Sequence, residues 1–297
     1  MITVCIPVYN SDVCDLVNAL YEQGQKSPNK IEIIVIDDCS NSEVKEINSV
    51  LSTKITYIEN KKNQGRACIR NQFLEYATMP FLLFIDGDSQ IISNTFLTDY
   101  LQEIAKNEIT VLCGASIYQE EKPARNYFLR WKYSVVRESK SLSERLKNPS
   151  LGFKTNNFIV RKDILQQVKF NETLLGYGHE DTLFGFELNQ HGYIINHIDN
   201  PVLNKNLDDN TTFLNKTNEG LKSLLKVVEI VGGDEDFTKN IKLLVVHRRI
   251  KKNPVLNFFF SLSFVSLPIL TFCLKKGFFT LRMFDAYKLF QLEKLRF

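Results

Sequence analysis

Apolar, strand-like runs alternate with helix-like segments through the first 118 residues of this 297-residue chain. Continuous apolar strands alternating with helices are typical of a mostly parallel sheet covered by helices on both faces. In such sheets ligands bind at the carboxyl ends of the strands. We therefore predict an α/β fold with its site at that edge. The expected strands are 2–8, 31–38, 54–60, 80–86 and 108–118, and the expected helices are 11–24, 41–51, 65–77 and 94–106.

Two aspartates separated by one glycine follow the fourth expected strand, in "FLLFIDGDSQ". Carboxylates at the end of a core strand lose solvation, and this costs free energy unless something compensates. Asp86 and Asp88 at this spacing can offer oxygen ligands to one hard cation, Mg²⁺ or Mn²⁺, which in turn neutralises a diphosphate leaving group. A solvated turn is the alternative explanation of the same pattern.

Two further motifs supply groups for a nucleotide. Asp38 in "IDDCS" can accept a hydrogen bond from a base or a ribose hydroxyl, or else cap the helix that follows Cys39. Arg70 in "NQGRACIRN" lies near a helix start, where it can reach a phosphate or a nucleobase, or form a surface salt bridge instead.

Adjacent carboxylates, Glu180 and Asp181, open an expected helix after the glycine-containing loop "GYGH". One of them can hold an acceptor hydroxyl while the other accepts its proton. A helix N-terminus favours the ionised form and so keeps the base available. The alternative is that the pair only caps the helix.

Residues 119–150 are charged and aromatic with patchy periodicity, which predicts a mobile excursion containing some helix. It holds Trp131, Tyr133, Arg137 and Arg145, which could close over an acceptor, although solvated salt bridges explain the same arginines. Beyond this excursion the expected strands are 155–162 and 193–203, and the expected helices are 180–190, 210–231 and 236–252.

The end of the chain is both basic and apolar. Residues 240–297 hold eleven Lys and Arg against two acidic residues, so they carry +9 while the rest carries −6. Such asymmetry indicates a tail that meets a polyanion. The uncharged segment 255–274 has about the ~20 residues that cross a bilayer. Pro268 and lysines at both ends argue against a simple crossing.

We therefore expect a monotopic hairpin followed by an interfacial helix over 277–297. The alternative is that both segments are core helices of a larger fold. The apolar stripe of the expected interfacial helix is Phe279, Met283, Tyr287 and Phe290.

Composition narrows the class of protein further. With 44% hydrophobic and 24% charged residues, the chain is globular and not disordered. Its six cysteines show neither CxxC nor metal-ligand spacing, which favours reduced core residues over disulfides. The N-terminus lacks a basic n-region, so we expect no secretory signal and a cytoplasmic catalytic part. Nucleic-acid binding is not expected, because the basic charge lies beside the hydrophobic tail.

The motifs PVYN (7–10), IDDCS (35–39), NQGRACIRN (63–71), DGD (86–88) and GYGHED (176–181), in this order, resemble those of family 2 inverting glycosyltransferases of the GT-A fold. The last motif also resembles one in galactosyltransferases and chondroitin-polymerase-like enzymes. The resemblance implies a GT-A domain over 1–205, made of a nucleotide-binding half (1–118) and an acceptor half (119–205). A helical extension (206–253) and a membrane-associating tail (254–297) would follow.

The same resemblance assigns roles to single residues. These are Pro7 and Tyr9 in the nucleoside pocket, Asp38 on uracil or ribose, Asn63 and Arg70 on the nucleotide, Asp86 on ribose or metal, Asp88 as principal metal ligand, Glu180 orienting the acceptor, and Asp181 as general base.

One departure from the family pattern concerns a histidine metal ligand that usually follows the ED motif. Asn204 stands where this histidine is expected, and His197 lies earlier, in a strand-like run. Either His197 substitutes for it, or the diphosphate holds most of the metal. A lone histidine in an apolar alternation, such as His197, is more often structural.

The resulting functional hypothesis is inverting, Mn²⁺- or Mg²⁺-dependent transfer of a sugar from a UDP-sugar to a hydroxyl of a glycan or lipid-linked saccharide. Cell-surface polysaccharide synthesis at the cytoplasmic face of the inner membrane, on an anionic membrane surface, is the expected setting. A sugar nucleotidyltransferase is disfavoured because "PVYNSDVCD" lacks the glycine and arginine of a phosphate loop. A non-catalytic membrane-associated scaffold that binds nucleotides is the alternative.

Overall fold

The computed structural model describes residues 1–106 and 108–296, so Phe297, the last residue of the expected interfacial helix, lies outside the described residues. The chain forms two compact units. Unit 1 comprises Met1–Gln119, Arg137–Leu175 and Glu180–Asn206, and unit 2 comprises Glu120–Val136, Gly176–His179 and Leu207–Phe297.

Among the described residues of unit 1, eight strands form one sheet in the order β3-β2-β1-β4-β7-β6-β8-β5. Strand β1 is parallel to β2 and β4, β2 is parallel to β3, and β6 is parallel to β8. Strands β7 and β5 run antiparallel to their neighbours. The strands are β1 (Ile2–Val8), β2 (Ile31–Asp37), β3 (Thr56–Glu59), β4 (Phe81–Ile85), β5 (Ser89–Ile91), β6 (Val111–Tyr118), β7 (Asn157–Arg161) and β8 (Ile195–Asn204).

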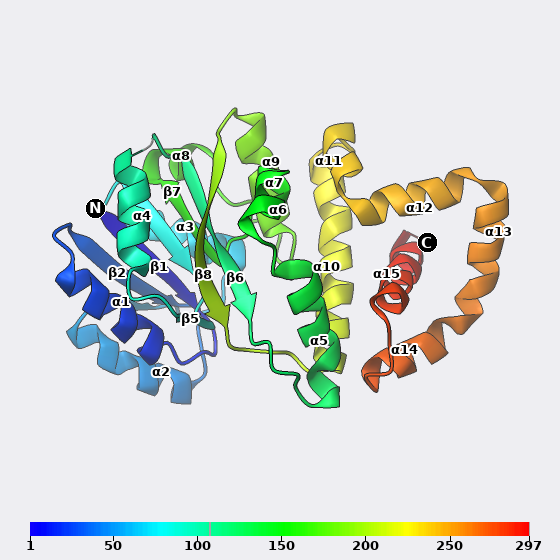
Figure 1. Ribbon diagram of the computed structural model, residues 1–297, viewed down its shortest axis with the longest axis horizontal. Coiled ribbons are helices and arrows are strands. Elements are labelled where there is room, and N and C mark those ends of the chain that lie inside the picture. The colour runs from blue at the N-terminus through cyan, green and yellow to red at the C-terminus, as the bar shows by residue number, and fades with distance from the viewer. Residues whose placement is uncertain (107, 297) are drawn as a thin grey trace. The chain divides into compact units, whose positions relative to one another are not determined.

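Helices cover both faces of this sheet. Successive residues of a strand point to opposite sides, so a continuously apolar strand gives both faces an apolar surface to bury. In β2, Ile34 and Ile36 belong to one buried cluster, whereas Ile33 and Val35 belong to the other. The first cluster is covered by α3 (Arg66–Tyr76), α8 (Lys162–Gln167) and α9 (Glu180–Gln190), and the second by α1 (Cys14–Lys26) and α4 (Phe96–Lys106) (Figure 1). The predicted α/β class with a mostly parallel sheet is confirmed.

Short elements account for most differences from the expected pattern. Strand β5 and helix α8 were not expected, because three and six residues carry too little periodicity. The segment expected as a mobile excursion contains several short helices, one of which a Ser141–Glu144 capping box begins. These elements are η2 (Arg125–Tyr127), α5 (Phe128–Tyr133), η3 (Ser134–Glu138), α6 (Leu142–Leu146) and α7 (Pro149–Gly152), of which η2 and α5 belong to unit 2. Unit 1 contains α2 (Ser42–Ser49) and η1 (Val50–Thr53) as well.

Unit 2 is helical. Its longest helix, α10 (Asn210–Ile230), begins after Asp209, whose side chain accepts from the Thr211 and Thr212 amides. The helix expected over 236–252 is divided at Ile241, whose extended backbone separates α11 from α12. The remaining helices are α11 (Glu235–Asn240), α12 (Lys242–Lys252), α13 (Pro254–Ser263), η4 (Phe264–Ser266), α14 (Leu267–Lys275) and α15 (Leu281–Arg296).

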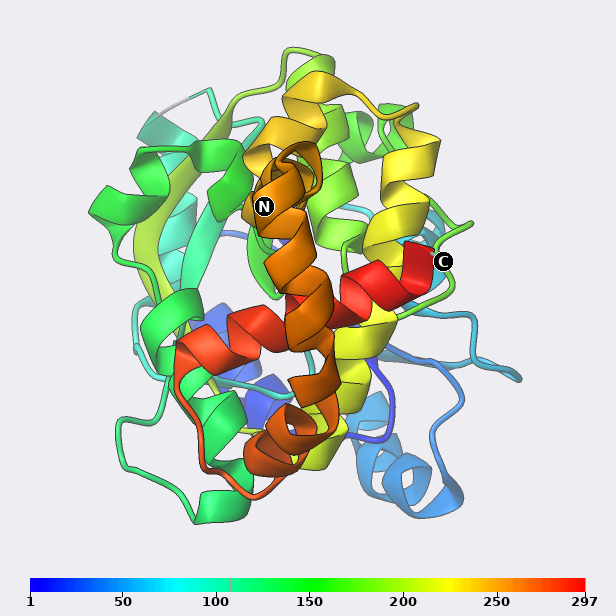
Figure 2. The same ribbon diagram turned by 90° about the vertical axis from the view of Figure 1, so that its right-hand side faces the viewer.

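Helix α15 does not present its apolar stripe to a membrane, and this corrects the expected interfacial helix over 277–297. Tyr287 and Phe290 are buried in the core of unit 2 together with Phe213 of α10 and Leu274 of α14. Figure 2 shows α15 in red passing behind α13 in orange. Sequence periodicity predicted the stripe, but it did not say what covers it.

Among the described residues, one helical segment is long and apolar enough to cross a membrane. It runs over Pro254–Lys275, and 11% of it is buried. Length and composition alone do not separate a crossing from other uses of such a segment.

Candidate active site

Hydrogen bonds to side chains connect the loops that follow β1 and β2. The Asn10 amide donates to Ser40 Oγ at 2.8 Å, and the Asn41 amide donates to Asn10 Oδ1 at 2.8 Å. Asn10 and Cys39 both have positive φ angles, a conformation that costs free energy in non-glycine residues and clusters at functional sites. Tyr9 precedes Asn10 and is exposed, so its ring is available for stacking.

Asp38 is buried and holds the loop that leads into α3. Its Oδ1 accepts from the Gln64 amide at 2.9 Å and from Asn60 Nδ2, and its Oδ2 accepts from the Gly65 amide at 2.9 Å. It does not cap α2, because Asn41 accepts from the Val44 amide there. The loop that Asp38 holds presents the exposed Asn63.

The DGD turn packs directly against the end of β1. A Cβ atom on Gly87 would lie 3.1 Å from Val13 Cγ1 and 3.4 Å from the Pro7 carbonyl oxygen, so the glycine allows the close approach. Ser11 Oγ also donates to the Gly87 carbonyl at 3.3 Å. The turn therefore lies beside the PVYN loop.

Asn204 lies next to Asp88. The Lys205 amide donates to the Asp88 carbonyl at 3.1 Å, and Ser89 pairs with Asn204 in the β5–β8 register. Asn204 Oδ1 is buried and has no hydrogen-bond partner in the described structure. A hard oxygen donor thus stands at the edge of the DGD turn, at the position where the family resemblance leads one to expect a histidine.

Arg70 joins two of the motifs, and this corrects the alternative of a surface salt bridge. Its Nη2 donates to Asp86 Oδ1 at 2.9 Å, and its Nη1 lies 3.7 Å from Glu180 Oε1. The side chain is 3% exposed, so the pair is not a surface salt bridge. Because one guanidinium contacts both carboxylates, the DGD and ED motifs lie together in unit 1.

The two carboxylates of the ED motif have different surroundings. Glu180 is 6% exposed; Arg66 Nη1 lies 3.4 Å from its Oε1, and its Oε2 is buried without a hydrogen-bond partner. Asp181 is 16% exposed, and its Oδ2 accepts from Lys154 Nζ at 2.8 Å. Asp181 is thus the more accessible carboxylate, and it contacts the Lys154 ammonium.

Arg66 and Lys154 are site residues that the sequence analysis did not select. Arg66 is half-exposed, and its position one helical turn before Arg70 was the available signal. Lys154 lies in the loop before β7, and no periodicity or motif marks it.

His197 is not placed to bind a metal. Its Nδ1 accepts from Arg145 Nη1 at 2.9 Å, and its Nε2 donates to the Pro149 carbonyl at 2.9 Å. Arginine can only donate and a carbonyl can only accept, so the ring is the neutral Nε2–H tautomer with neither nitrogen left for a ligand. Burial, together with the Arg145 charge, lowers the pKa of His197. The structural alternative describes this residue correctly.

In the part of the chain that the structure describes, no group of three or more His, Cys, Asp and Glu side chains is arranged to hold a metal ion.

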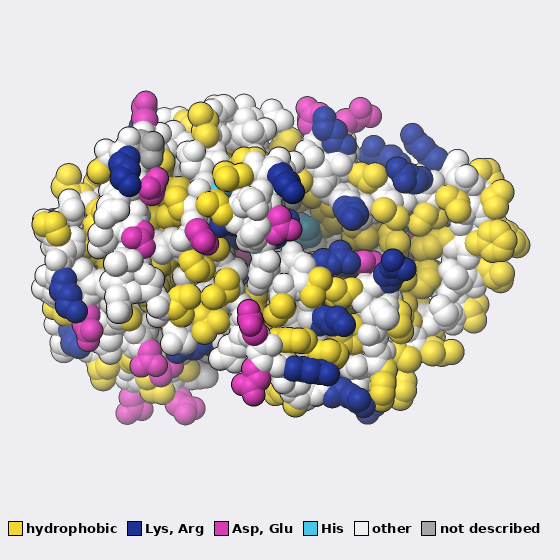
Figure 3. All heavy atoms as spheres, viewed as in Figure 1, with side chains coloured by type: hydrophobic (Ala, Val, Ile, Leu, Met, Phe, Trp, Pro, Cys, Tyr) yellow, Lys and Arg dark blue, Asp and Glu magenta, His cyan; other side chains and the backbone are white. Residues whose placement is uncertain are grey.

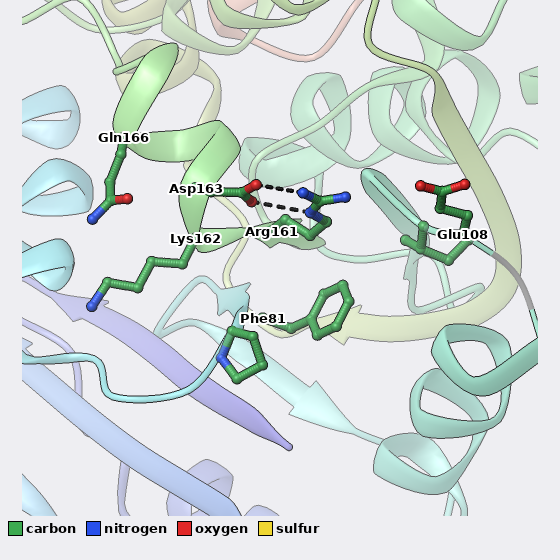
Figure 4. Close-up of a pocket in the computed structure, with 8 residues that line it drawn as sticks. Phe81, Glu108, Arg161, Lys162, Asp163 and Gln166 are labelled. Carbon is green, nitrogen blue, oxygen red and sulfur yellow. Dashed lines mark hydrogen bonds and ion pairs between the residues drawn. The ribbon is translucent and has the colours of Figure 1, made fainter.

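A separate cavity of 510 Å³ lies at the opposite edge of the sheet (Figure 4). Phe81, which lines it, begins β4, whereas Asp86 follows the end of that strand. Arg161 and Asp163 form an ion pair on its wall, and Lys162 Nζ donates to the Ala77 carbonyl. This cavity is not part of the cluster around Arg70.

Comparison with known proteins agrees with this geometry. The model of the family "Glycosyl transferase family 2" matches residues 3–169. Two curated proteins of Haemophilus influenzae, each named an uncharacterized glycosyltransferase, are 30% identical over 117 residues and 33% identical over 90 residues. These stretches cover 38% and 30% of this chain, and 46% and 29% of the relatives, so the chain matches less than half of either relative.

Solved structures share the fold. The mannosyltransferase PcManGT from Pyrobaculum calidifontis, in complex with GDP-Man and Mn²⁺, has a TM-score of 0.64 at 14% identity, over 99% of this chain and 86% of that one. TarS 1–349 of S. aureus in complex with UDP-GlcNAc has a TM-score of 0.51 at 17% identity, over 99% and 91%. Likeness at such identities concerns the fold alone, here of the GT-A type. Since the family model covers more than half of the sequence, the chain belongs to glycosyl transferase family 2.

Proposed function

We propose that this enzyme transfers a sugar from a UDP-sugar to a hydroxyl of a glycan or lipid-linked saccharide, with inversion at the anomeric carbon. The observation that carries the proposal is the contact of one buried guanidinium, Arg70, with Asp86 and with Glu180. It brings the motif proposed to bind the donor next to the motif proposed to bind the acceptor. Such proximity is a requirement for direct transfer.

The donor site of this proposal uses the loops at the carboxyl edge of the sheet. Tyr9, beside Pro7, stacks on the base, and Asp38 accepts from the uracil or ribose and positions Asn63 near the nucleotide. Arg66, half-exposed at the start of α3, replaces the buried Arg70 as the cation that meets the phosphates. The N-terminus of α3 adds its own attraction for anions.

A divalent cation, Mn²⁺ or Mg²⁺, fits the oxygen donors that the turn offers. Asp88 would be the principal ligand, and the buried, unpartnered Oδ1 of Asn204 beside it would be a second. Asp86 contributes less, because Arg70 already engages its Oδ1. When bound, such an ion would neutralise charge on the diphosphate leaving group.

Asp181 is the proposed general base. The acceptor oxygen forms a bond to the anomeric carbon on the face opposite UDP, the bond from that carbon to the UDP oxygen breaks, and the hydroxyl proton passes to Asp181. Lys154 Nζ, 2.8 Å from its Oδ2, positions this carboxylate. Glu180 Oε2, buried and unpartnered, is the oxygen left to accept a hydrogen bond from the acceptor.

We further propose that the enzyme works at the cytoplasmic face of the inner membrane in cell-surface polysaccharide synthesis. The long, exposed apolar segment Pro254–Lys275 supports membrane attachment.

The test is UDP release from a panel of UDP-sugars with purified full-length protein, with and without Mn²⁺ or Mg²⁺ and an acceptor extract. Asp181→Asn should lower turnover roughly 10²- to 10⁴-fold, the range that general-base catalysis supplies. The matched control is Asp15→Asn, which changes a side chain that is 92% exposed at the start of α1. Near-normal turnover of Asp181→Asn would remove this residue as the base, and unchanged turnover after chelation would remove the metal.

A further inference from the structure

We propose that α13 and α14 lie in the plane of an anionic phospholipid surface, with one face of the segment in the bilayer interface and the other in the core of unit 2. The inference deepens the proposed membrane attachment, on which it rests, because it states which residues enter the lipid and excludes a crossing.

The outward face of the segment is a continuous apolar stripe. Its members follow one another at intervals of three or four residues, which is the spacing of one helical face. They are 60–81% exposed: Val255, Phe258, Leu262, Val265, Ile269 and Phe272. A stripe of this kind along about five helical turns is a marker of a binding surface.

The inward face of the same segment is already used. Phe260 stacks on Phe290 of α15 with ring centroids 5.2 Å apart, and Phe264 packs on the edge of the same ring at 5.4 Å. Leu267 and Leu274 are buried in the core of unit 2. A crossing helix would have to leave this core and expose the apolar face of α15. A helix lying in the interface keeps the core intact.

Charge identifies lipid as the partner. Lys251 and Lys252 precede the stripe, Lys275 and Lys276 follow it, and all four are exposed. In Figure 3, Lys and Arg side chains gather over α12, next to the hydrophobic side chains that cover α13. Cations at both ends of an apolar stripe fit a surface of anionic headgroups, to which each basic residue adds attraction.

A cavity of 250 Å³ in unit 2 adds a specific place for a headgroup phosphate. Four of its lining residues are cations, Arg248, Lys251, Lys252 and Arg296. The nearby carboxylate Glu293 accepts from Lys251 Nζ and from His247 Nε2, both at 2.7 Å. One carboxylate against four cations leaves the cavity electropositive, which suits a phosphate anion.

A second copy of the chain is a poorer occupant. An isologous contact would bring the basic residues around the stripe near the same residues of the partner, and like charges repel. Self-association through the stripe is therefore an outcome that the test must detect.

The experiment measures sedimentation of the full-length protein with phosphatidylcholine vesicles, with or without 30 mol% phosphatidylglycerol (roughly the anionic content that gives a marked surface potential). We expect anionic vesicles to bind at least about tenfold more tightly, and salt to reduce that excess. Phe258→Ser with Ile269→Ser should weaken vesicle binding roughly tenfold or more. Lys252→Gln with Arg296→Gln should remove most of the preference for anionic lipid.

Matched controls change exposed residues of the same chemical kinds in unit 1. Ile47→Ser with Val50→Ser, and Lys26→Gln with Lys30→Gln, should leave vesicle binding unchanged. Equal binding by the stripe and control variants would overturn the proposal. Light scattering that shows a dimer in the parent protein and a monomer in Phe258→Ser with Ile269→Ser would overturn it in favour of self-association.

Trypsin added outside the vesicles separates the two membrane arrangements. In-plane binding predicts cleavage at both Lys251–Lys252 and Lys275–Lys276, whereas protection of one flank would indicate a crossing and overturn the inference. UDP release is measured in the same samples. UDP release without vesicle binding would refute this surface and leave the proposed function standing, and vesicle binding without UDP release would do the reverse.

Discussion

Unit 1 buries two arginines to a similar degree, but their partners differ. Arg70 contacts two carboxylates, Asp86 and Glu180. Arg145 of α6 donates to the Gly114 carbonyl at 3.0 Å, to the Ile198 carbonyl at 2.8 Å and to His197 Nδ1. In both side chains Nε has no hydrogen-bond partner among the described residues, so the difference lies in the terminal nitrogens.

This difference distinguishes an arginine of the candidate active site from one that supports the sheet. The partners of Arg70 come from a strand end and a helix start, which are positions where charged groups commonly bind ligands. The partners of Arg145 are backbone carbonyls of β6 and β8 and a neutral ring, and they tie a short helix to the sheet. Burial of an arginine therefore does not by itself mark function, and the charge of its partners is the informative feature.

The largest effect is expected at Arg70. Arg70→Met leaves the Asp86 and Glu180 carboxylates without their shared cation, and breaking a buried ion pair in this way costs about 3–5 kcal/mol. UDP release should fall at least as far as the folded fraction, since both motifs lose their position. Urea unfolding measures the loss of stability. Arg70→Lys should recover part of it, because one ammonium replaces the charge but cannot form both contacts.

A smaller loss is expected at Arg145. Arg145→Met removes the donor to two partly buried carbonyls and to His197. It leaves no carboxylate without its cation, so the cost should be about 2–3 kcal/mol. UDP release per folded molecule should stay near that of the parent protein. A turnover loss as large as that of Arg70→Met would abolish the distinction between the two arginines.

The comparison also shows what the sequence could and could not predict. Apolar runs and helical periods predicted the sheet and most of its helices, and strand-end positions predicted that Tyr9, Asp38 and Asp86 belong to neighbouring loops of unit 1. These are consequences of local pattern and of chain direction in a parallel sheet. The pairing of Arg70 with Asp86 and Glu180 joins residues up to 110 positions apart, and no local pattern encodes it.

The corrections have the same origin. His197 and Arg145 lie 52 residues apart, so sequence alone left the ring nitrogens of His197 open for a metal. The apolar stripe of α15 predicted a membrane-facing helix. Helices α10 and α14 bury this stripe through tertiary packing, which the periodicity of α15 does not encode. Amphipathicity predicts that a face is covered but does not identify what covers it.

Asp38 extends the comparison to a buried carboxylate whose partners, like those of Arg145, are neutral. Asp38→Asn keeps the shape but turns an amide group toward the backbone donor of Gln64 or Gly65. Loss of this hydrogen bond at the start of α3 should cost about 1 kcal/mol. Because the same loop carries Asn63, the Michaelis constant for the UDP-sugar should rise. Thermal unfolding and initial rates measure the two effects, and a stability loss with an unchanged Michaelis constant would confine Asp38 to a structural role.

The smallest effect is expected at His197 and appears only with pH. Burial and the charge of Arg145 lower the pKa of His197 in the folded protein, whereas the unfolded chain titrates near the usual value of 6.5. Below that value the unfolded state binds more protons, so stability falls with acidification, by at most about 1.4 kcal/mol per pH unit until the lowered pKa is passed.

His197→Gln can accept from Arg145 and donate to Pro149 without titrating, so its unfolding free energy should depend less on pH between 7 and 5.5 than that of the parent. His191→Gln, at an exposed histidine, is the control and should leave the dependence unchanged. Equal losses of stability in His197→Gln and the parent over this range would show that protonation of His197 does not affect folding. The neutral partners of Arg145 that matter would then be the backbone carbonyls alone.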